Sequence, residues 1–196
     1  DKRLERLGKN TVAEQTCQTY AAVFEHVRVV IRERDETLRQ KLNRITDDIV
    51  ISHDAHLGMG HSLAAGIAGL HWDWAFVGLL DMPFIEQQTL RRLCEVARNL
   101  EHPAILRPRL AQNGKDGIPY GHPIGWHHTF FEHLRDCEGD QGARDLLRKH
   151  RDAIIEVPVD DPGIQQDIDT PADLAASIAV FPSTTGSSDS SRNAGT

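Results

Sequence analysis

Three acidic side chains have the type and position to bind a cation. Asp81 ends an apolar run over residues 74–80, and Asp167 and Asp169 alternate with Ile168 just before Thr170-Pro171. An unpaired carboxylate is costly inside a core, so we expect Asp81 where a buried strand ends and water or a cation begins. Alternate carboxylates provide the hard oxygen ligands that Mg²⁺ takes together with phosphate oxygens and water. The pattern predicts a magnesium site, although a turn at Asp81-Met82-Pro83 and a helix start at Asp-Thr-Pro are equally simple explanations.

A glycine-bearing segment, Gly58-Met59-Gly60-His61-Ser62, precedes an expected helix. Glycines at a helix N-terminus let backbone N–H groups approach an anionic or polar ligand closely. The dinucleotide fingerprint and the P-loop pattern do not match here. Gly60-His61-Ser62-Leu63-Ala64 nearly matches the nucleophile elbow GxSxG, but residues 53–57 separate it from the strand that an elbow serine must follow. We therefore expect Ser62 to cap the helix, a role compatible with ligand binding.

Other candidate residues lie in loops. Gly121-His122-Pro123 can present His122 to a ligand or form a structural turn, and Asp140 precedes a helix that it can cap. Lys2 lies in a basic, glycine-bearing segment and can neutralise a phosphate or remain solvated. The eleven histidines do not show the paired spacing that predicts a zinc site.

The elements that must position these residues alternate between strands and helices. Apolar, β-branched runs predict strands over residues 27–31, 48–52, 74–81, 103–106 and 154–157. Helical patterns follow these strands, and residues 111–125 are expected to form a long loop or hairpin. The alternation predicts an α/β protein: a three-layer α/β/α, Rossmann-like fold with a mostly parallel, mixed sheet. Ligands of such sheets bind beyond the carboxyl ends of the strands, where Asp81 is expected.

Composition limits the class of protein. The 196 residues are 39% hydrophobic and 26% charged, as in a soluble domain, and the net charge of -7 argues against a general nucleic-acid binder. We expect one domain over residues 1–181 and, because Ser, Thr, Gly and Asn dominate the end, a disordered tail over 182–196. Neither a secretory signal nor an apolar run of about 20 residues is visible, and the three cysteines are far apart. We therefore expect a cytoplasmic protein with free thiols.

Six segments together resemble the molybdenum cofactor cytidylyltransferases, within the MobA-like nucleotidyltransferase superfamily. Each segment is weak alone, but their order along residues 1 to about 180 makes the resemblance specific. They are Asp1-Lys2-Arg3-Leu4, Gly58-Met59-Gly60-His61-Ser62-Leu63, Asp81-Met82-Pro83-Phe84, Gly121-His122-Pro123, Gly139-Asp140-Gln141-Gly142-Ala143-Arg144 and Asp167-Ile168-Asp169-Thr170-Pro171.

The resemblance implies a magnesium-dependent transfer of CMP from CTP to the molybdopterin form of the molybdenum cofactor, with release of pyrophosphate. It implies that Lys2 neutralises triphosphate charge and that Asp81, with Asp167 or Asp169, binds magnesium. The remaining implied roles are base and ribose contacts at Gly58, Gly60 and Ser62, and contacts to the pterin acceptor at His122 and Asp140. A molybdoenzyme or its chaperone is the implied protein partner.

Members of the resembled family carry a strand and a glycine-rich loop, LAAGxSxRFG, immediately before the lysine that matches Lys2. We expect such a segment to complete the sheet and the nucleotide site, because the present sequence begins inside that motif. The motif forms favour CTP over GTP. A sugar-phosphate nucleotidyltransferase, suggested by the DxD of Asp167 and Asp169, and a protein that binds and delivers a pterin cofactor without catalysis remain alternatives.

Overall fold

The computed structural model describes residues 1–111, 117, 119–140, 142–170 and 172–175. The tail expected over 182–196 lies outside the described residues, as does Pro171 at the expected start of the last helix. The helices are α1 (Val12–Ala21), α2 (Glu36–Leu42), α3 (Met59–Ile67), α4 (Gln87–Arg98), α5 (Phe131–Arg135) and α6 (Arg144–Lys149). The strands are β1 (Arg6–Leu7), β2 (Asn10–Thr11), β3 (Val29–Arg32), β4 (Ile49–Ser52), β5 (Trp74–Val77), β6 (Ile105–Leu110), β7 (Ile124–His127) and β8 (Ile154–Val159).

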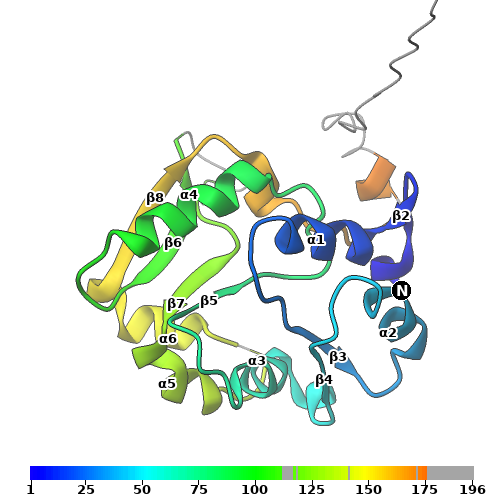
Figure 1. Ribbon diagram of the computed structural model, residues 1–196, viewed down its shortest axis with the longest axis horizontal. Coiled ribbons are helices and arrows are strands. Elements are labelled where there is room, and N and C mark those ends of the chain that lie inside the picture. The colour runs from blue at the N-terminus through cyan, green and yellow to red at the C-terminus, as the bar shows by residue number, and fades with distance from the viewer. Residues whose placement is uncertain (112–116, 118, 141, 171, 176–196) are drawn as a thin grey trace, which may run out of the picture.

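The strands form a mixed arrangement, which confirms the predicted α/β fold with a mixed sheet. The largest sheet has the order β5-β7-β6-β8, in which β7 is antiparallel to both neighbours while β6 and β8 are parallel. A second, parallel pair joins β3 and β4, and β1 and β2 form a short antiparallel hairpin. Figure 1 shows β3 and β4 with α1 and α2 on one side of the molecule and the four-stranded sheet on the other.

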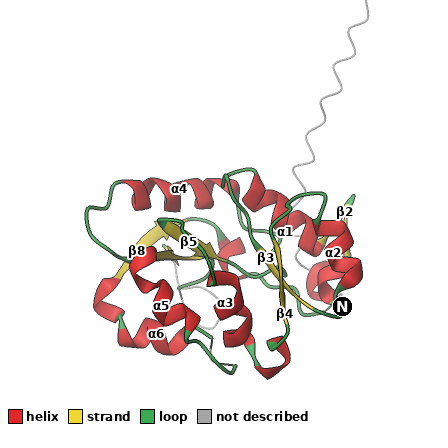
Figure 2. Ribbon diagram, turned by 60° about the horizontal axis from the view of Figure 1, so that its bottom comes forward, coloured by secondary structure: helices red, strands yellow, loops and turns green. Residues whose placement is uncertain are grey.

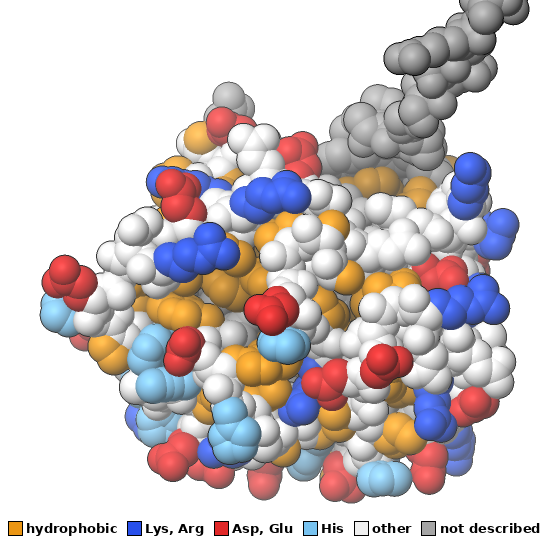
Figure 3. All heavy atoms as spheres, viewed as in Figure 1, with side chains coloured by type: hydrophobic (Ala, Val, Ile, Leu, Met, Phe, Trp, Pro, Cys, Tyr) orange, Lys and Arg blue, Asp and Glu red, His pale blue; other side chains and the backbone are white. Residues whose placement is uncertain are grey.

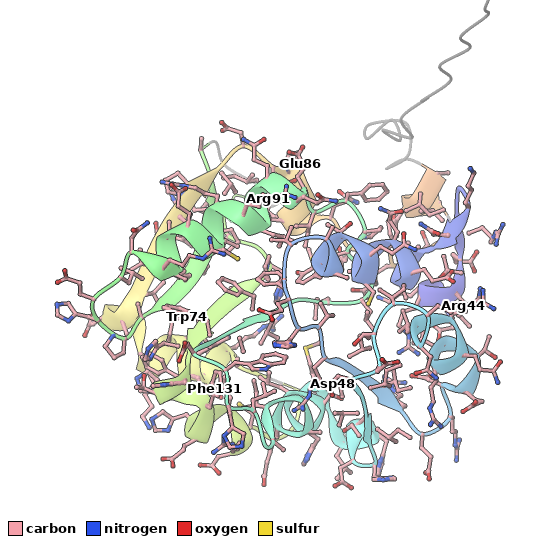
Figure 4. The ribbon with its side chains drawn as sticks, viewed as in Figure 1. Arg44, Asp48, Trp74, Glu86, Arg91 and Phe131 are labelled. Carbon is pink, nitrogen blue, oxygen red and sulfur yellow. The ribbon has the colours of Figure 1, made fainter. Side chains whose placement is uncertain are left out.

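Two layers of helices enclose the four-stranded sheet. Figure 2 shows α4 on one face and α3, α5 and α6 on the other. Side-chain alternation along β6 explains this: Ile105 packs in the cluster with Phe131 and Leu134 of α5, whereas Leu106 packs with Leu93 and Ala97 of α4. Figure 4 labels Phe131 on its helix. The third cluster, between α1, α2 and β3, is built on Cys17, Leu38, Leu42, Val29 and Ile31.

One detail agrees with the sequence-based expectation and one differs from it. Residues 111–125 are expected to form a long loop or hairpin, and the antiparallel pairing of β7 with β6 is that of a hairpin. The strand β7 itself is short, and Gly125 and the neighbouring glycines and prolines mask it in the sequence. A Cβ on Gly125 would lie 2.7 Å from the Phe76 ring, so the glycine is what lets β7 pair closely beside β5. Strand β5 ends at Val77, and Asp81 follows it in a turn rather than at the strand end. The reason is that no described strand pairs with residues 78–81.

The surface agrees with the composition. On the face shown in Figure 3, acidic and basic side chains of the described residues are interspersed. In the part of the chain that the structure describes, no helix combines the length and the apolar character needed to cross a membrane.

Candidate functional site

The structure brings Lys2, Asp81 and Asp169 together. The Lys2 ammonium lies 2.9 Å from Oδ2 of Asp81 and 2.5 Å from Oδ1 of Asp169. These residues are far apart in sequence, with a separation of 167 positions from Lys2 to Asp169. One cation therefore bridges two carboxylates that the sequence analysis had singled out separately. We call these three residues the lysine–aspartate cluster.

Short local structures hold this cluster in place. Lys2 begins a 3-10 turn, η1 (Lys2–Leu4), which Asp1 caps by accepting the backbone N–H of Arg3. The chain then enters α1 through a complete capping box between Thr11 and Glu14. The Thr16 hydroxyl of α1 lies 3.2 Å from the carbonyl oxygen of Leu80, which anchors the turn that carries Asp81.

The second carboxylate of the cluster, that of Asp169, is held near Asp81 by a backbone hydrogen bond between the two segments. The backbone N–H of Ile168 donates to the carbonyl oxygen of Asp81 at 2.9 Å, so residues 167–169 run beside the Asp81 turn. Ile168 is fully buried with Val12 and Leu174. Asp167 beside it is half-buried, whereas Asp169 is exposed and pairs with Lys2.

The charged groups of the cluster differ in how completely they are paired. Burial disfavours the charged form of Lys2, but its hydrogen bonds to Asp169 and Asp81 outweigh this and raise the pKa of the ammonium. Asp81 is only 17% exposed. Its Oδ1 is buried without a hydrogen-bond partner among the described residues. An unpaired buried carboxylate oxygen is costly, and this one is an available ligand for a second cation.

A divalent metal fits the cluster in a limited way. Among the described residues, no group of three or more His, Cys, Asp and Glu side chains is arranged to hold a metal. Mg²⁺ commonly takes only one or two carboxylates and completes its shell with phosphate oxygens and water. The free oxygen of Asp81 and the exposed carboxylate of Asp169 meet that requirement. Asp167 does not join them: it lies close enough to His122 to influence its pKa, and it makes no ion pair with Lys2.

The glycines at 58 and 60 have a structural explanation that the sequence did not reveal. The N–H of Gly60 donates to the carbonyl oxygen of Gly139 at 2.8 Å. A Cβ on Gly58 would lie 2.2 Å from the carbonyl carbon of Gly139, and a Cβ on Gly60 would lie 2.5 Å from that of Glu138. The two loops thus pack backbone against backbone. The contact also brings the exposed Asp140 beside Gly58, so two of the predicted site segments do meet.

Ser62 is not the helix cap that the sequence predicted. Helix α3 begins at Met59 with Gly58 as its N-cap, at φ 130°, and no side chain caps it. Ser62 therefore lies inside the helix. Between β4 and α3 the chain forms a 3-10 turn, η2 (Ala55–Leu57), so Ser62 is also not on a sharp strand-to-helix turn. This geometry argues against a serine nucleophile.

His122 is positioned at the end of the loop before β7. Its backbone N–H donates to the carbonyl oxygen of Ile164 at 2.8 Å, and Nδ1 of its imidazole lies 3.4 Å from the carbonyl oxygen of Val77. A Cβ on Gly121 would lie 2.0 Å from the same Ile164 oxygen, so only glycine permits this approach. Burial lowers the pKa of His122, which keeps the imidazole neutral near pH 7.

Sequence reasoning missed one positioning residue, Asp161. It is 2% exposed, and its carboxylate accepts hydrogen bonds from the N–H of Glu86, the hydroxyl of Thr89 and the N–H of Gly163. These bonds tie the segment after Asp81 to the segment before Asp167. The available signal was the turn signature Asp161-Pro162-Gly163, in which an aspartate caps the following backbone.

Comparisons with known proteins agree with this fold. A model of the MobA-like NTP transferase domain matches residues 1–154. No curated protein matches the chain. Among solved structures, the chain is similar to Rv0371c from Mycobacterium tuberculosis H37Rv, with 24% identity and a TM-score of 0.76 over 91% of this chain and 89% of that chain. A structure of Rv0371c in complex with manganese has a TM-score of 0.73 at 24% identity, over 93% and 91% of the two chains.

Two further structures extend the likeness. A nucleotidyl transferase from Methanothermobacter thermautotroptrophicus has a TM-score of 0.73 at 19% identity, over 92% of this chain and 85% of that chain. A cytidylyltransferase from Leptospira borgpetersenii has a TM-score of 0.71 at 15% identity, over 93% of this chain and 81% of that chain. At these identities the likeness shows a shared Rossmann-like fold. Because the domain model spans most of the chain, the protein belongs to the MobA-like NTP transferase domain family of nucleotidyltransferases.

Proposed function

We propose that this protein transfers CMP from CTP to the molybdopterin form of the molybdenum cofactor, with magnesium as the metal and pyrophosphate as the leaving product. The observation that carries the proposal is the lysine–aspartate cluster, in which one ammonium and two carboxylates meet beside an unpartnered oxygen of Asp81. Such a cluster suits a triphosphate and its metal. The choice of CTP and of the pterin acceptor rests on the motif resemblance.

The reaction needs charge neutralisation more than covalent chemistry. A terminal phosphate oxygen of the acceptor attacks the α-phosphorus of CTP, and the bond from that phosphorus to the β-phosphate oxygen breaks. Negative charge develops on the departing pyrophosphate, and Lys2 would neutralise it. Asp81 and Asp169 would hold the metal, which when bound would supply positive charge to the phosphates. His122, neutral because of burial, would offer a hydrogen bond to the acceptor without adding charge.

The metal, the nucleotide and the ligand contacts in this proposal are supported by different kinds of observation. A divalent metal is supported by the donor set and by the manganese complex of Rv0371c. CTP is supported by motif form and by the likeness to a cytidylyltransferase. Gly58, Gly60 and Ser62 were expected to meet the base and ribose, and Asp140 the acceptor. The contact between the 58–60 and 138–140 loops keeps these residues in one region, and their ligand contacts remain part of the proposal.

The decisive experiment measures pyrophosphate release from CTP with magnesium and molybdopterin. Asp81→Asn should lower the rate by about 100-fold or more, because the neutral amide neither balances Lys2 nor binds a hard cation well. The matched control is Asp47→Asn, which makes the same chemical change at an exposed carboxylate outside the cluster and should leave the rate unchanged. Full activity in Asp81→Asn would disprove the role given to the cluster.

Two alternatives predict different substrates. Replacing CTP by GTP, and molybdopterin by sugar phosphates, tests whether the chain is a guanylyl or a sugar-phosphate nucleotidyltransferase. A protein that only binds a pterin cofactor and passes it to a molybdoenzyme or its chaperone should bind the cofactor without binding nucleotide. Calorimetry that shows magnesium-dependent CTP binding would count against that alternative.

A further inference from the structure

A cavity lined by four arginines lies away from the lysine–aspartate cluster. Its volume is about 660 Å³, and its lining comprises Arg107, Arg144, Leu147, Arg148, Arg151, Asp152, Ile154 and Glu156. Four of these residues recur at the i, i+3, i+4 and i+7 positions, beginning at the first residue of α6. That spacing places Arg144, Leu147, Arg148 and Arg151 on one side of α6 and the turn that follows it. We call this the arginine cavity.

The floor of the arginine cavity comes from the sheet. Arg107 of β6 is paired in register with Glu156 of β8, and Ile105 pairs with Ile154 two residues earlier, on the same face of the sheet. Ile105 and Ile154 are covered by α5 and α6. The same face continues to Arg107 and Glu156, where the apolar cover gives way to charged residues. The cavity therefore opens where the α6 layer ends over the sheet.

Positive charge in the arginine cavity is incompletely balanced. Glu156 is shared between two guanidiniums, at 3.3 Å from Nη2 of Arg107 and 3.4 Å from Nε of Arg109. The Nε of Arg107 is buried and has no hydrogen-bond partner among the described residues. A buried donor without an acceptor is destabilising, so negative charge brought to this guanidinium stabilises the site.

The helical arginines are free to turn to a ligand. Arg148 pairs with Asp145, and Arg151 with Asp152, but both pairs are well exposed and contribute little in water. Arg144 forms no ion pair in the described part of the chain. By contrast, the Arg107 guanidinium lies 3.5 Å from the centre of the Tyr120 ring, a cation–π contact that fixes its plane. Arg107 is thus held in place, whereas the three arginines of α6 and the following turn can change conformation to contact a ligand.

We propose that the arginine cavity is a second anion site, which binds the phosphate group of a small molecule. The planar guanidinium matches two phosphate oxygens at once, and the volume lies in the range of small-ligand sites. Leu147 and Ile154 add apolar surface for the part of the ligand that carries the phosphate. Anion binding at the cavity does not require the proposed function to be correct, whereas the assignment of the phosphate to acceptor or product rests on that function.

The position of Arg144 connects this cavity to the rest of the site. Arg144 follows the loop that packs on Gly60, and it begins the helix that lines the cavity. Burial is the main reason for the low pKa of His122, and the charge of Arg144 adds to it. The phosphate bound here would belong either to the phosphorylated acceptor or to released pyrophosphate. Both present the same chemistry to the arginines.

The test measures anion binding to the full chain by calorimetry. EDTA is present to remove divalent metal, so that metal-dependent nucleotide binding does not contribute. Pyrophosphate and ribose 5-phosphate serve as probes: tighter binding of the phosphomonoester assigns the site to the acceptor, and tighter binding of pyrophosphate assigns it to the product. Arg144→Gln and Arg148→Gln should each weaken binding by about tenfold or more. Both residues are exposed, so these variants should fold, which circular dichroism would verify.

A matched control separates this site from a general effect of surface charge. Arg92→Gln, which removes an exposed arginine of α4, should leave anion binding in EDTA unchanged. The proposal is overturned if neither probe binds, if the two cavity variants bind as the wild type does, or if Arg92→Gln weakens binding as much as they do. None of these results depends on nucleotidyl transfer.

Discussion

At the scale of single residues, the site is organised by one ammonium that two carboxylates share. Lys2 keeps its proton because Asp169 and Asp81 favour the charged form more than burial opposes it. Asp81 contributes one oxygen to Lys2 and retains the other without a partner. A carboxylate with one oxygen paired and the other without a partner can accept a second cation without losing its first. This division of roles is what distinguishes Asp81 from an ordinary turn residue.

His122 gives a pH prediction at this scale. Burial lowers its folded-state pKa below the unfolded value of about 6.5, so below that pH the unfolded chain binds more protons than the folded one. The stabilisation from a neutral His122 is present above pH 6.5 and is lost as the pH falls through the folded pKa. His122→Gln should therefore show a smaller drop in urea midpoint between pH 7.5 and 5.5 than the wild type. Equal drops in the urea midpoint of the variant and the wild type would contradict this prediction.

At the scale of elements, two loops are joined by glycine backbone. The start of α3 lies on residues 138–140 so closely that neither Gly58 nor Gly60 has room for a side chain. Buried contacts of this kind hold loops from distant parts of the chain in register. The glycines that the sequence suggested as ligand contacts therefore also build the region in which a ligand would bind.

Gly60→Ala tests this contact. Alanine normally stabilises a helix relative to glycine by about 1 kcal/mol. Here the added Cβ would overlap the backbone of Glu138, so we expect a net loss of about 1–3 kcal/mol in the free energy of unfolding, measured by urea denaturation. As a control, Ala65→Gly on the same helix should cost about 1 kcal/mol, the usual propensity difference. A stabilised Gly60→Ala would show that the loops are not in close contact.

At the scale of the whole molecule, the parallel pair β3-β4 and the four-stranded sheet are not joined by strand pairing among the described residues. In the described residues β3 pairs only with β4, and β5 pairs only with β7, so each has one edge without a strand. Leu80 packs with the cluster of α1, α2 and β3, so the segment after β5 runs toward the second pair of strands. Unpaired edges are where an additional strand binds. The expected upstream strand and glycine-rich loop would suit this position.

Hydrogen exchange tests that expectation. A chain extended upstream by a strand and the LAAGxSxRFG loop should slow amide exchange at the unpaired edges of β3 and β5 by about tenfold or more, because paired amides exchange only when the structure opens. Amides between β6 and β8, already paired, should change little. Unchanged exchange in β3 and β5 would mean that the added segment does not enter the sheet.

The sequence by itself determined the α/β class and the segments that carry chemistry. Hydrophobic periodicity, glycine and proline positions, and carboxylates next to apolar runs are local signals, and they sufficed for Lys2, Asp81 and Asp169 as candidates. Local signals were insufficient where a residue depends on its neighbours in space. Ile124-Gly125-Trp126-His127 forms a strand because Gly125 fits against Phe76, a residue of another strand.

Only the tertiary structure decided which candidates act together. It joined Lys2 to Asp169 across 167 positions, separated Asp167 from that pair, placed Ser62 inside a helix and assembled the arginine cavity from β6, β8 and α6. The physical reason is that local patterns report whether a side chain is buried or exposed. Which charges share one site depends on how buried surfaces such as Ile168 and Gly60 pack, and that is a property of the folded chain.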